Sequence, residues 1–123
     1  MRLSKDDSSD IGFALWCLAS EAISKEEFSE WILHVIEVVP DPPLYIFDLL
    51  DSSGYLTDIN KSIPFTPSAG LSDHQVSAIS GIALTRGVSP FEEIDEKQCM
   101  KAMRKETAVV EQFSQLFPFI EFS

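Results

Sequence analysis

AISKEEFSEWILHVIEVVP, residues 22–40, contains a helix start, an amphipathic repeat and a helix stop. Ser24 and Glu27 fit a capping box, in which each side chain accepts a hydrogen bond from the other residue's backbone N–H. Ile23 and Phe28 flank the box as a hydrophobic staple. Because proline cannot continue a helix, Pro40 and Pro42 stop it. The apolar residues recur at the spacing of one buried helical face: Phe28, Trp31, Ile32, Val35, Ile36 and Val39.

Start signals of the same kind recur downstream. GLSDHQV places Ser72 and Gln75 in the capping-box positions, and VSPFEEI places Ser89 and Glu92 there. The proline after Ser89 suits the first turn of a helix. These signals and the apolar periodicity predict helices over about 10–21, 24–39, 43–51, 72–86 and from 90 or 95 to 117.

The remaining stretches indicate turns and loops. NKSIPFTPSAG (60–70) contains two prolines and a glycine and is typical of a loop over a core. Residues 44–47 are also β-prone, which leaves a strand open as an alternative to the short helix predicted there. We therefore expect an all-α, single-domain bundle of five or six helices spanning residues 1–123.

Charge is the strongest global feature. The formal net charge is −11 and the sequence pI is about 4.4. Residues 1–60 contain three basic and twelve acidic residues, a net of −9, and residues 61–123 have a net of −2. Such a field repels nucleic acid and anionic lipid and attracts a basic protein, although acidity also serves solubility alone.

Composition predicts a cytosolic protein with free thiols. Hydrophobic residues make up 45% of the chain, which favours a folded domain, yet no apolar run has membrane-spanning length. The segment MRLSKDDSSD does not resemble a signal peptide. Cys17 and Cys99 are far apart in apolar helical contexts, so buried thiols are expected rather than a disulfide.

DLLDSSGYLTD (48–58) resembles a calcium-binding loop, but its spacing is wrong. If Gly54 takes the sixth position of an EF-hand loop, Asp51 falls at the third. The first position is then Leu49 and the twelfth is Asn60, neither of which supplies a carboxylate. A turn after a short helix is the better interpretation, and no metal site is expected.

No catalytic signature is found in the sequence. The two histidines, His34 and His74, lack a second ligand at helical spacing, and we expect both to be solvated surface residues. Neither cysteine belongs to a CxxC pair, and glycine-rich phosphate loops and GxSxG elbows are absent. The sequence therefore predicts a protein that is not an enzyme and needs no cofactor.

Acidic and tyrosine side chains form the candidate binding residues. Glu26 and Glu30 share one helical face with Glu37, where solvated carboxylates, a binding surface or acid–base catalysis are the alternatives. Tyrosine among acids suits contact with a basic protein, because it anchors an interface at low entropy cost. The predicted partner-binding residues are Glu26, Glu30, Glu37, Asp41, Tyr45, Asp48, Asp51, Tyr55 and Asp58.

Residues 21–51, EAISKEEFSEWILHVIEVVPDPPLYIFDLLD, resemble a known group. The helix ending EEFxEWxxxVIE, the PP loop and the aromatic YIFDLLD are similar to small bacterial immunity proteins of contact-dependent growth inhibition and other polymorphic toxin systems. The resemblance covers about a quarter of the chain. It is a pattern of residue types, and nothing from residue 62 onward contributes to it.

The resemblance implies a cytoplasmic inhibitor that binds one cognate toxin domain, one to one, and is a monomer when free. The implied toxin is a basic nuclease, and an RNase is expected rather than a DNase. The inhibitor would cover or block the toxin's active site. Neither nucleic acid nor membrane is an expected partner. The alternative is a helical adaptor or regulatory subunit that binds another basic protein.

Overall fold

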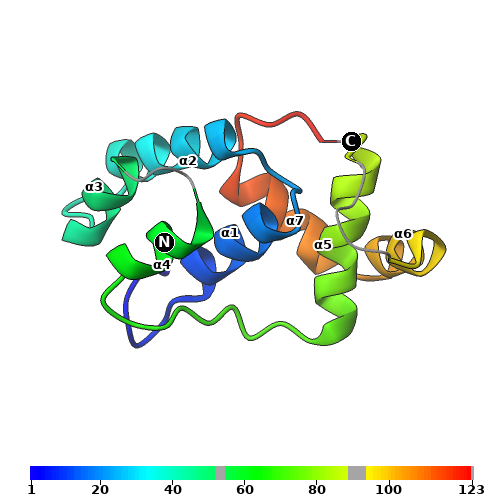
Figure 1. Cartoon of the computed structure of the whole chain (residues 1–123). Helices are drawn as coiled ribbons and strands as arrows, with labels where there is room; N and C mark the ends of the chain where they lie inside the picture. The colour runs from blue at the N-terminus through cyan, green and yellow to red at the C-terminus, as the bar shows by residue number, and fades with distance from the viewer. Residues whose placement is uncertain (52–54, 89–93, 123) are drawn as a thin grey trace.

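The residues that the structure describes, 1–51, 55–88 and 94–122 of this computed structural model, form seven helices and no strand (Figure 1). The all-α prediction is confirmed for these residues. None of these helices is long and apolar enough to cross a membrane. The helices are α1 (Ser9–Ala19), α2 (Lys25–Val38), α3 (Leu44–Leu50), α4 (Leu56–Ser62), α5 (Asp73–Thr85), α6 (Glu96–Lys105) and α7 (Thr107–Leu116).

Two of the predicted helix starts are confirmed. The Glu27 backbone N–H donates to Ser24 Oγ at 3.1 Å, and the Ser24 N–H donates to Glu27 Oε1 at 2.8 Å. Ser72 and Gln75 form the same reciprocal pair at the start of α5, at 3.2 and 2.8 Å. The box predicted at residues 89–92 lies outside the described residues.

Trp31 lies at the centre of the core, fully buried on the inner face of α2. Its ring centroid is 5.7 Å from that of Phe28 and 6.1 Å from that of Phe117, just beyond α7. Phe117 in turn lies edge-on to Phe113, 5.0 Å between centroids. The aromatic end of the chain therefore closes the core against α2, although the two segments are far apart in sequence.

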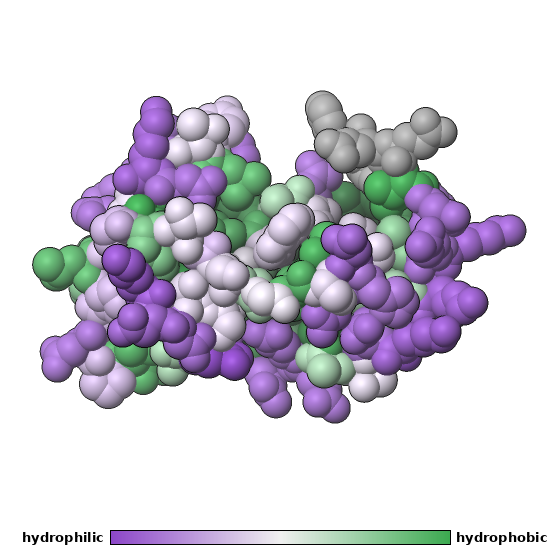
Figure 2. All heavy atoms as spheres, turned by 90° about the horizontal axis from the view of Figure 1, so that it is seen from below, coloured by the Kyte–Doolittle hydropathy of each residue, from purple (hydrophilic) through white to green (hydrophobic). Residues whose placement is uncertain are grey.

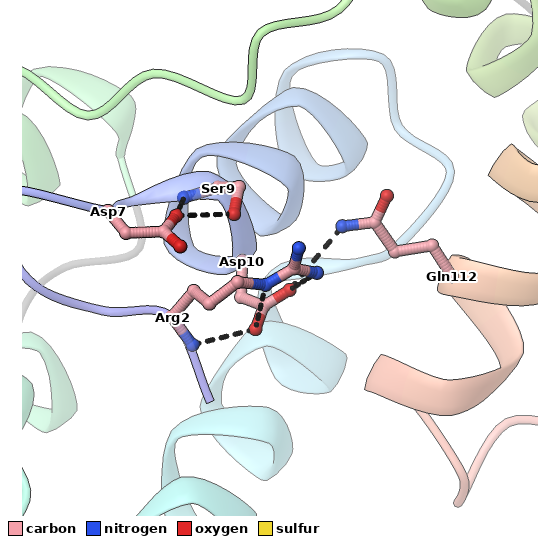
Figure 3. Close-up of polar contacts among 5 residues, drawn as sticks. All are labelled: Arg2, Asp7, Ser9, Asp10 and Gln112. Atoms are coloured by element: carbon pink, nitrogen blue, oxygen red, sulfur yellow. Dashed lines mark hydrogen bonds and ion pairs between the residues drawn. The ribbon is translucent and has the colours of Figure 1, made fainter.

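The N-terminal segment is fastened to α1 by Asp10 (Figure 3). This buried carboxylate accepts hydrogen bonds from the backbone N–H of Arg2 at 2.7 Å and from its guanidinium at 2.8 and 3.3 Å, and Gln112 of α7 donates at 3.4 Å. Burial disfavours the charged form, but these hydrogen bonds outweigh it and lower the pKa of Asp10. Leu3 is thereby held in the core.

Helices α5 and α6 approach each other at Gly81. A Cβ added there would lie 2.5 Å from the carbonyl oxygen of Cys99 and 2.8 Å from Cβ of Met103. Glycine is required because any side chain would separate the two backbones. This contact holds α6 at one end of the molecule, opposite α3 (Figure 1).

The expected number of helices, five or six, was too low, in part because α4 was not predicted. Residues 60–62 belong to α4 and not to the predicted loop. The helix has no side-chain cap at Tyr55, and its one fully buried residue is Ile59. Burial of Ile59 stabilises this short helix, which carries none of the local start signals by which the longer helices are recognised.

The predicted last helix is two helices, which meet at Glu106. This residue has φ −89° and ψ 65°, outside the helical region. Its carboxylate lies 2.8 Å from Nδ1 of His74 on α5, which ties the junction to a neighbouring helix. The apolar periodicity continues in phase from Cys99 to Phe113, so the sequence pattern does not reveal the break.

Helices α1 and α5 end in the same Schellman motif with different residues at its left-handed position. At the end of α1, Glu21 has φ +61°, and the next N–H donates to Cys17 O at 2.9 Å. At the end of α5, Gly87 has φ +84°, and the Val88 N–H donates to Ala83 O at 3.0 Å. Glycine adopts this conformation without a steric penalty, whereas glutamate adopts it only at a steric cost.

We expect Ser24→Ala and Ser72→Ala each to lower the free energy of unfolding by roughly 0.5–2 kcal/mol, because a backbone N–H at each helix start loses its acceptor. Chemical denaturation measures the change. Ser29→Ala, at an exposed interior position of α2, is the control and should not destabilise. Equal midpoints for all three variants would contradict the capping assignment.

Replacing Glu21 with glycine should raise the free energy of unfolding by roughly 1 kcal/mol, since it relieves the left-handed strain. The matched variant is Gly87→Ala, which introduces that strain and should destabilise; no atom lies within 4 Å of the added Cβ, so packing does not contribute. Denaturant midpoints of the two variants should move in opposite directions. Movement in the same direction would rule out this account.

Candidate protein-binding surface

The outer face of α2 is a stripe of three glutamates and one leucine. Glu26, Glu30, Leu33 and Glu37 are all exposed and recur at helical spacing, on the side opposite the buried stripe. Leu33 is 53% exposed. The three predicted glutamates therefore share one face, as the sequence indicated.

Helix α3 presents a second mixed face. Asp48 and Asp51 are exposed together with Leu44, which is 83% exposed, and Phe47. Asp41 lies in the turn between α2 and α3 with φ +50° and is also exposed. Apolar and hydrophilic atoms are interspersed at this end of the molecule in Figure 2. This face therefore combines exposed apolar area with negative charge.

Tyr45 was predicted at the surface, and this prediction is wrong. It is only 6% exposed, because it lies on the inner face of α3 with Ile46 and Leu49. Its hydroxyl donates to the carbonyl oxygen of Leu3, and its ring lies edge-on to Phe65 at 5.6 Å. Burial raises the pKa of Tyr45 to about 12. Tyr45 therefore belongs to the core, where its hydrogen bond to Leu3 connects α3 to the N-terminal segment.

Tyr55, in contrast, is 61% exposed, just before α4. Nζ of Lys25 lies 3.8 Å from its ring centroid, a cation–π contact that places Tyr55 beside the start of α2. Asp58 is exposed in the first turn of α4. The structure thus places Tyr55 near one end of the glutamate stripe, which the sequence could not establish.

Acidic residues dominate this part of the sequence. Residues 26–58 contain eight acidic residues and no lysine or arginine. Seven of the eight are exposed, and these are the seven predicted acids. The eighth, Glu27, is partly buried and paired. The acidic surface, as we call it, comprises Glu26, Glu30, Glu37, Asp41, Asp48, Asp51 and Asp58.

Glu27 pairs with Arg86, a contact that the sequence did not indicate. The guanidinium of Arg86 donates to both carboxylate oxygens of Glu27, at 2.8 Å to Oε1, and also to the carbonyl oxygen of Ala22. The Arg86 hydrogen bonds lower the pKa of Glu27 and outweigh the effect of burial. The pair connects the end of α5 to the start of α2.

Helix α6 carries charge of the opposite sign. Lys97, Lys101, Arg104 and Lys105 are all exposed. Their spacing places the first three on one helical face, a signal that was readable in the sequence but was hidden by the net negative count. Hydrophilic side chains gather at this end in Figure 2, far from α3 in Figure 1. The protein is therefore electrically asymmetric.

The histidines and cysteines differ in their exposure and contacts. His74 is exposed as expected and contacts Glu106, whereas His34 is half-buried with its ring 6.5 Å from that of Phe119. Cys17 and Cys99 are buried free thiols, as predicted. Among the described residues, no group of three or more His, Cys, Asp or Glu is placed to hold a metal ion.

Comparison with protein-family models, curated proteins and solved structures gives no match for this chain.

The ion pair makes stability depend on pH. A lowered carboxylate pKa means that the stabilisation by Glu27 is present above the ordinary pKa of 4.5 and is lost as pH falls through the folded-state value. Glu27→Gln keeps a side chain suited to the capping box but removes the charge. At neutral pH we expect a loss of about 1–2 kcal/mol, which shrinks as the pH is lowered toward about 3.

Urea unfolding of Glu27→Gln and wild type at several pH values measures this difference. Glu30→Gln, on the exposed face of α2, is the matched control and should change stability by no more than about 0.5 kcal/mol. A loss that stays constant across the pH range would show that the charge of Glu27 does not contribute.

Proposed function

We propose that this protein is an immunity protein, which binds a cognate basic toxin domain one to one through its acidic surface and neutralises it. The observation that carries the proposal is the exposure of seven acids on α2, the α2–α3 turn, α3 and its C-cap, and α4, with no basic residue between them in the sequence. Exposed apolar side chains, Leu33, Leu44 and Phe47, lie on the same helical faces.

Acids and apolar side chains would contribute in different ways. Carboxylates steer a basic partner and raise the association rate. Apolar anchors such as Phe47, which is exposed in the free protein and would be buried in the complex, slow dissociation. Rapid capture benefits an inhibitor that must act before the toxin does. Tyr55 adds a large amphipathic side chain beside the start of α2.

The class of partner follows from its charge and from the resemblance of residues 21–51 to immunity proteins. A nuclease holds phosphate in a positively charged active site, and an acidic surface can cover that site or block the approach to it. Among nucleases we propose an RNase. A gene for such a toxin directly upstream of this one would support the assignment.

A helical adaptor is the second candidate, and the basic face of α6 favours it. An adaptor must contact two partners at once, and here the acids of α3 and the basic residues of α6 lie at opposite ends of the molecule (Figure 1). Under this alternative the acidic surface still binds a basic protein, but inhibition does not result.

Replacing the four aspartates Asp41, Asp48, Asp51 and Asp58 with asparagine should slow association with the toxin domain about tenfold at low salt. The effect should shrink as ionic strength rises and the Debye length falls to about 8 Å. Stopped-flow association rates over a salt series measure both. The matched control replaces four exposed acids elsewhere: Asp73, Glu96, Glu111 and Glu121.

Both sets remove the same total charge, so they separate local contact from net charge. A larger loss from the control set, or equal losses, would place the interface outside the acidic surface. Toxin activity measured in the same mixtures distinguishes the two candidate functions, because an adaptor would bind without inhibiting.

A further inference from the structure

A groove of about 570 Å³ lies between the C-terminal end of α1 and α5, which lines it from its first turn, at Val76, to its last, at Leu84. Its walls expose polar and apolar surface in nearly equal parts, and the apolar side chains include Val76, Leu84, Val88 and Ile94. Trp16 lines it as well and is 43% exposed, a large aromatic surface left open to solvent. Ser20 and Ser80 are its neutral polar residues. Glu21 is its one charged lining residue among those described.

Glu21 lines the groove and has an unfavourable backbone conformation, with φ +61°. It occupies the left-handed position of a Schellman motif, where α5 uses Gly87 for the same turn. Its side chain is exposed, and within the described part of the chain its carboxylate forms no hydrogen bond or ion pair. A strained residue retained next to a groove is a reason to look for a function there.

The neighbouring cations do not neutralise Glu21. Lys25 and Arg86 line an adjoining cavity of about 540 Å³, which Glu21 also lines. Arg86 is already paired with Glu27 and with the carbonyl oxygen of Ala22. Nζ of Lys25 lies over the ring of Tyr55. The negative charge of Glu21 therefore remains available to a group that enters from outside.

An arginine side chain matches this combination of groups. Its guanidinium is planar and weakly hydrated, stacks on aromatic faces and pairs with carboxylates, while its methylenes cover apolar surface. A purely apolar ligand would leave the Glu21 carboxylate without a partner. A ligand with a carboxylate would be repelled by Glu21 and by the net charge of −11.

We propose that this groove binds an arginine side chain of a basic protein partner, with Glu21 pairing to the guanidinium and Trp16 contacting its face. The identity of that protein rests on the function proposed above, but the site is defined by its own residues. It extends the partner-binding region beyond the acidic surface to the end of α1 and along α5.

Titration with N-acetyl-arginine amide, followed by NMR on the labelled full-length protein, tests the site. N-acetyl-citrulline amide is the neutral probe of nearly equal shape. The arginine probe should shift the indole N–H signal of Trp16 and the methyl signals of Val76 and Leu84, and the citrulline probe should not. Glu21→Gln should weaken arginine binding roughly two- to fivefold, as loss of one exposed charge pair does.

Control variants separate the groove from general attraction to an acidic protein. Asp48→Asn, on α3, should leave the Trp16 titration unchanged. Equal shifts by both probes, or an affinity unaffected by Glu21→Gln, would overturn the proposal. Unchanged backbone amide signals in Glu21→Gln would show that its fold is retained.

The toxin domain then decides separately between the two proposals. If the arginine probe does not bind at the groove but the protein still binds the toxin domain, the proposed arginine site is wrong and the proposed function stands. If the arginine probe binds at the groove but the toxin domain does not bind, the proposed function is wrong and the arginine site stands.

Discussion

The side chain of Arg86 holds three segments of this protein in fixed relation. It donates to the carbonyl oxygen of Ala22 and pairs with Glu27, whose carboxylate also accepts the N–H of Ser24 in the capping box. Because both charged side chains are mostly buried, solvent and salt screen this pair less than a surface pair. One guanidinium thus sets the α1–α2 connection, the start of α2 and the end of α5. Glu21 of the groove and Glu26 of the acidic surface are both neighbours in sequence of the residues joined there.

The helices that the sequence predicted well are those with local signals. The start of α2 follows from Ser24 and Glu27, and its buried face follows from apolar residues at helical spacing. Where stability comes from distant contacts, the sequence had little to indicate it. Helix α4 forms because Ile59 is buried. The helical conformation is interrupted at Glu106 without a proline or glycine, and the apolar pattern continues across that interruption.

The candidate site shows the same division between local and tertiary information. Periodicity placed the glutamates of α2 on the outer face correctly, because a stripe opposite the core must face solvent. Tyr45 and Tyr55 have similar sequence surroundings, yet one is buried against Phe65 and the other is exposed. The tertiary contacts of Tyr45 with Leu3 and Phe65 decide between them. The pairing of Glu27 with Arg86 is likewise a tertiary contact that no local pattern indicates.

The separation of the basic helix α6 from the acidic surface has a practical consequence for the handling of this protein. Adsorbed on a positively charged resin or sensor chip, the molecule will settle with α3 against the support and α6 toward the solution (Figure 1). A binding assay built on such a support would hide the acidic surface and present the lysines of α6 instead. Attachment through the amines of Lys97 or Lys101 would orient the molecule the other way, with α2 and α3 accessible to a partner.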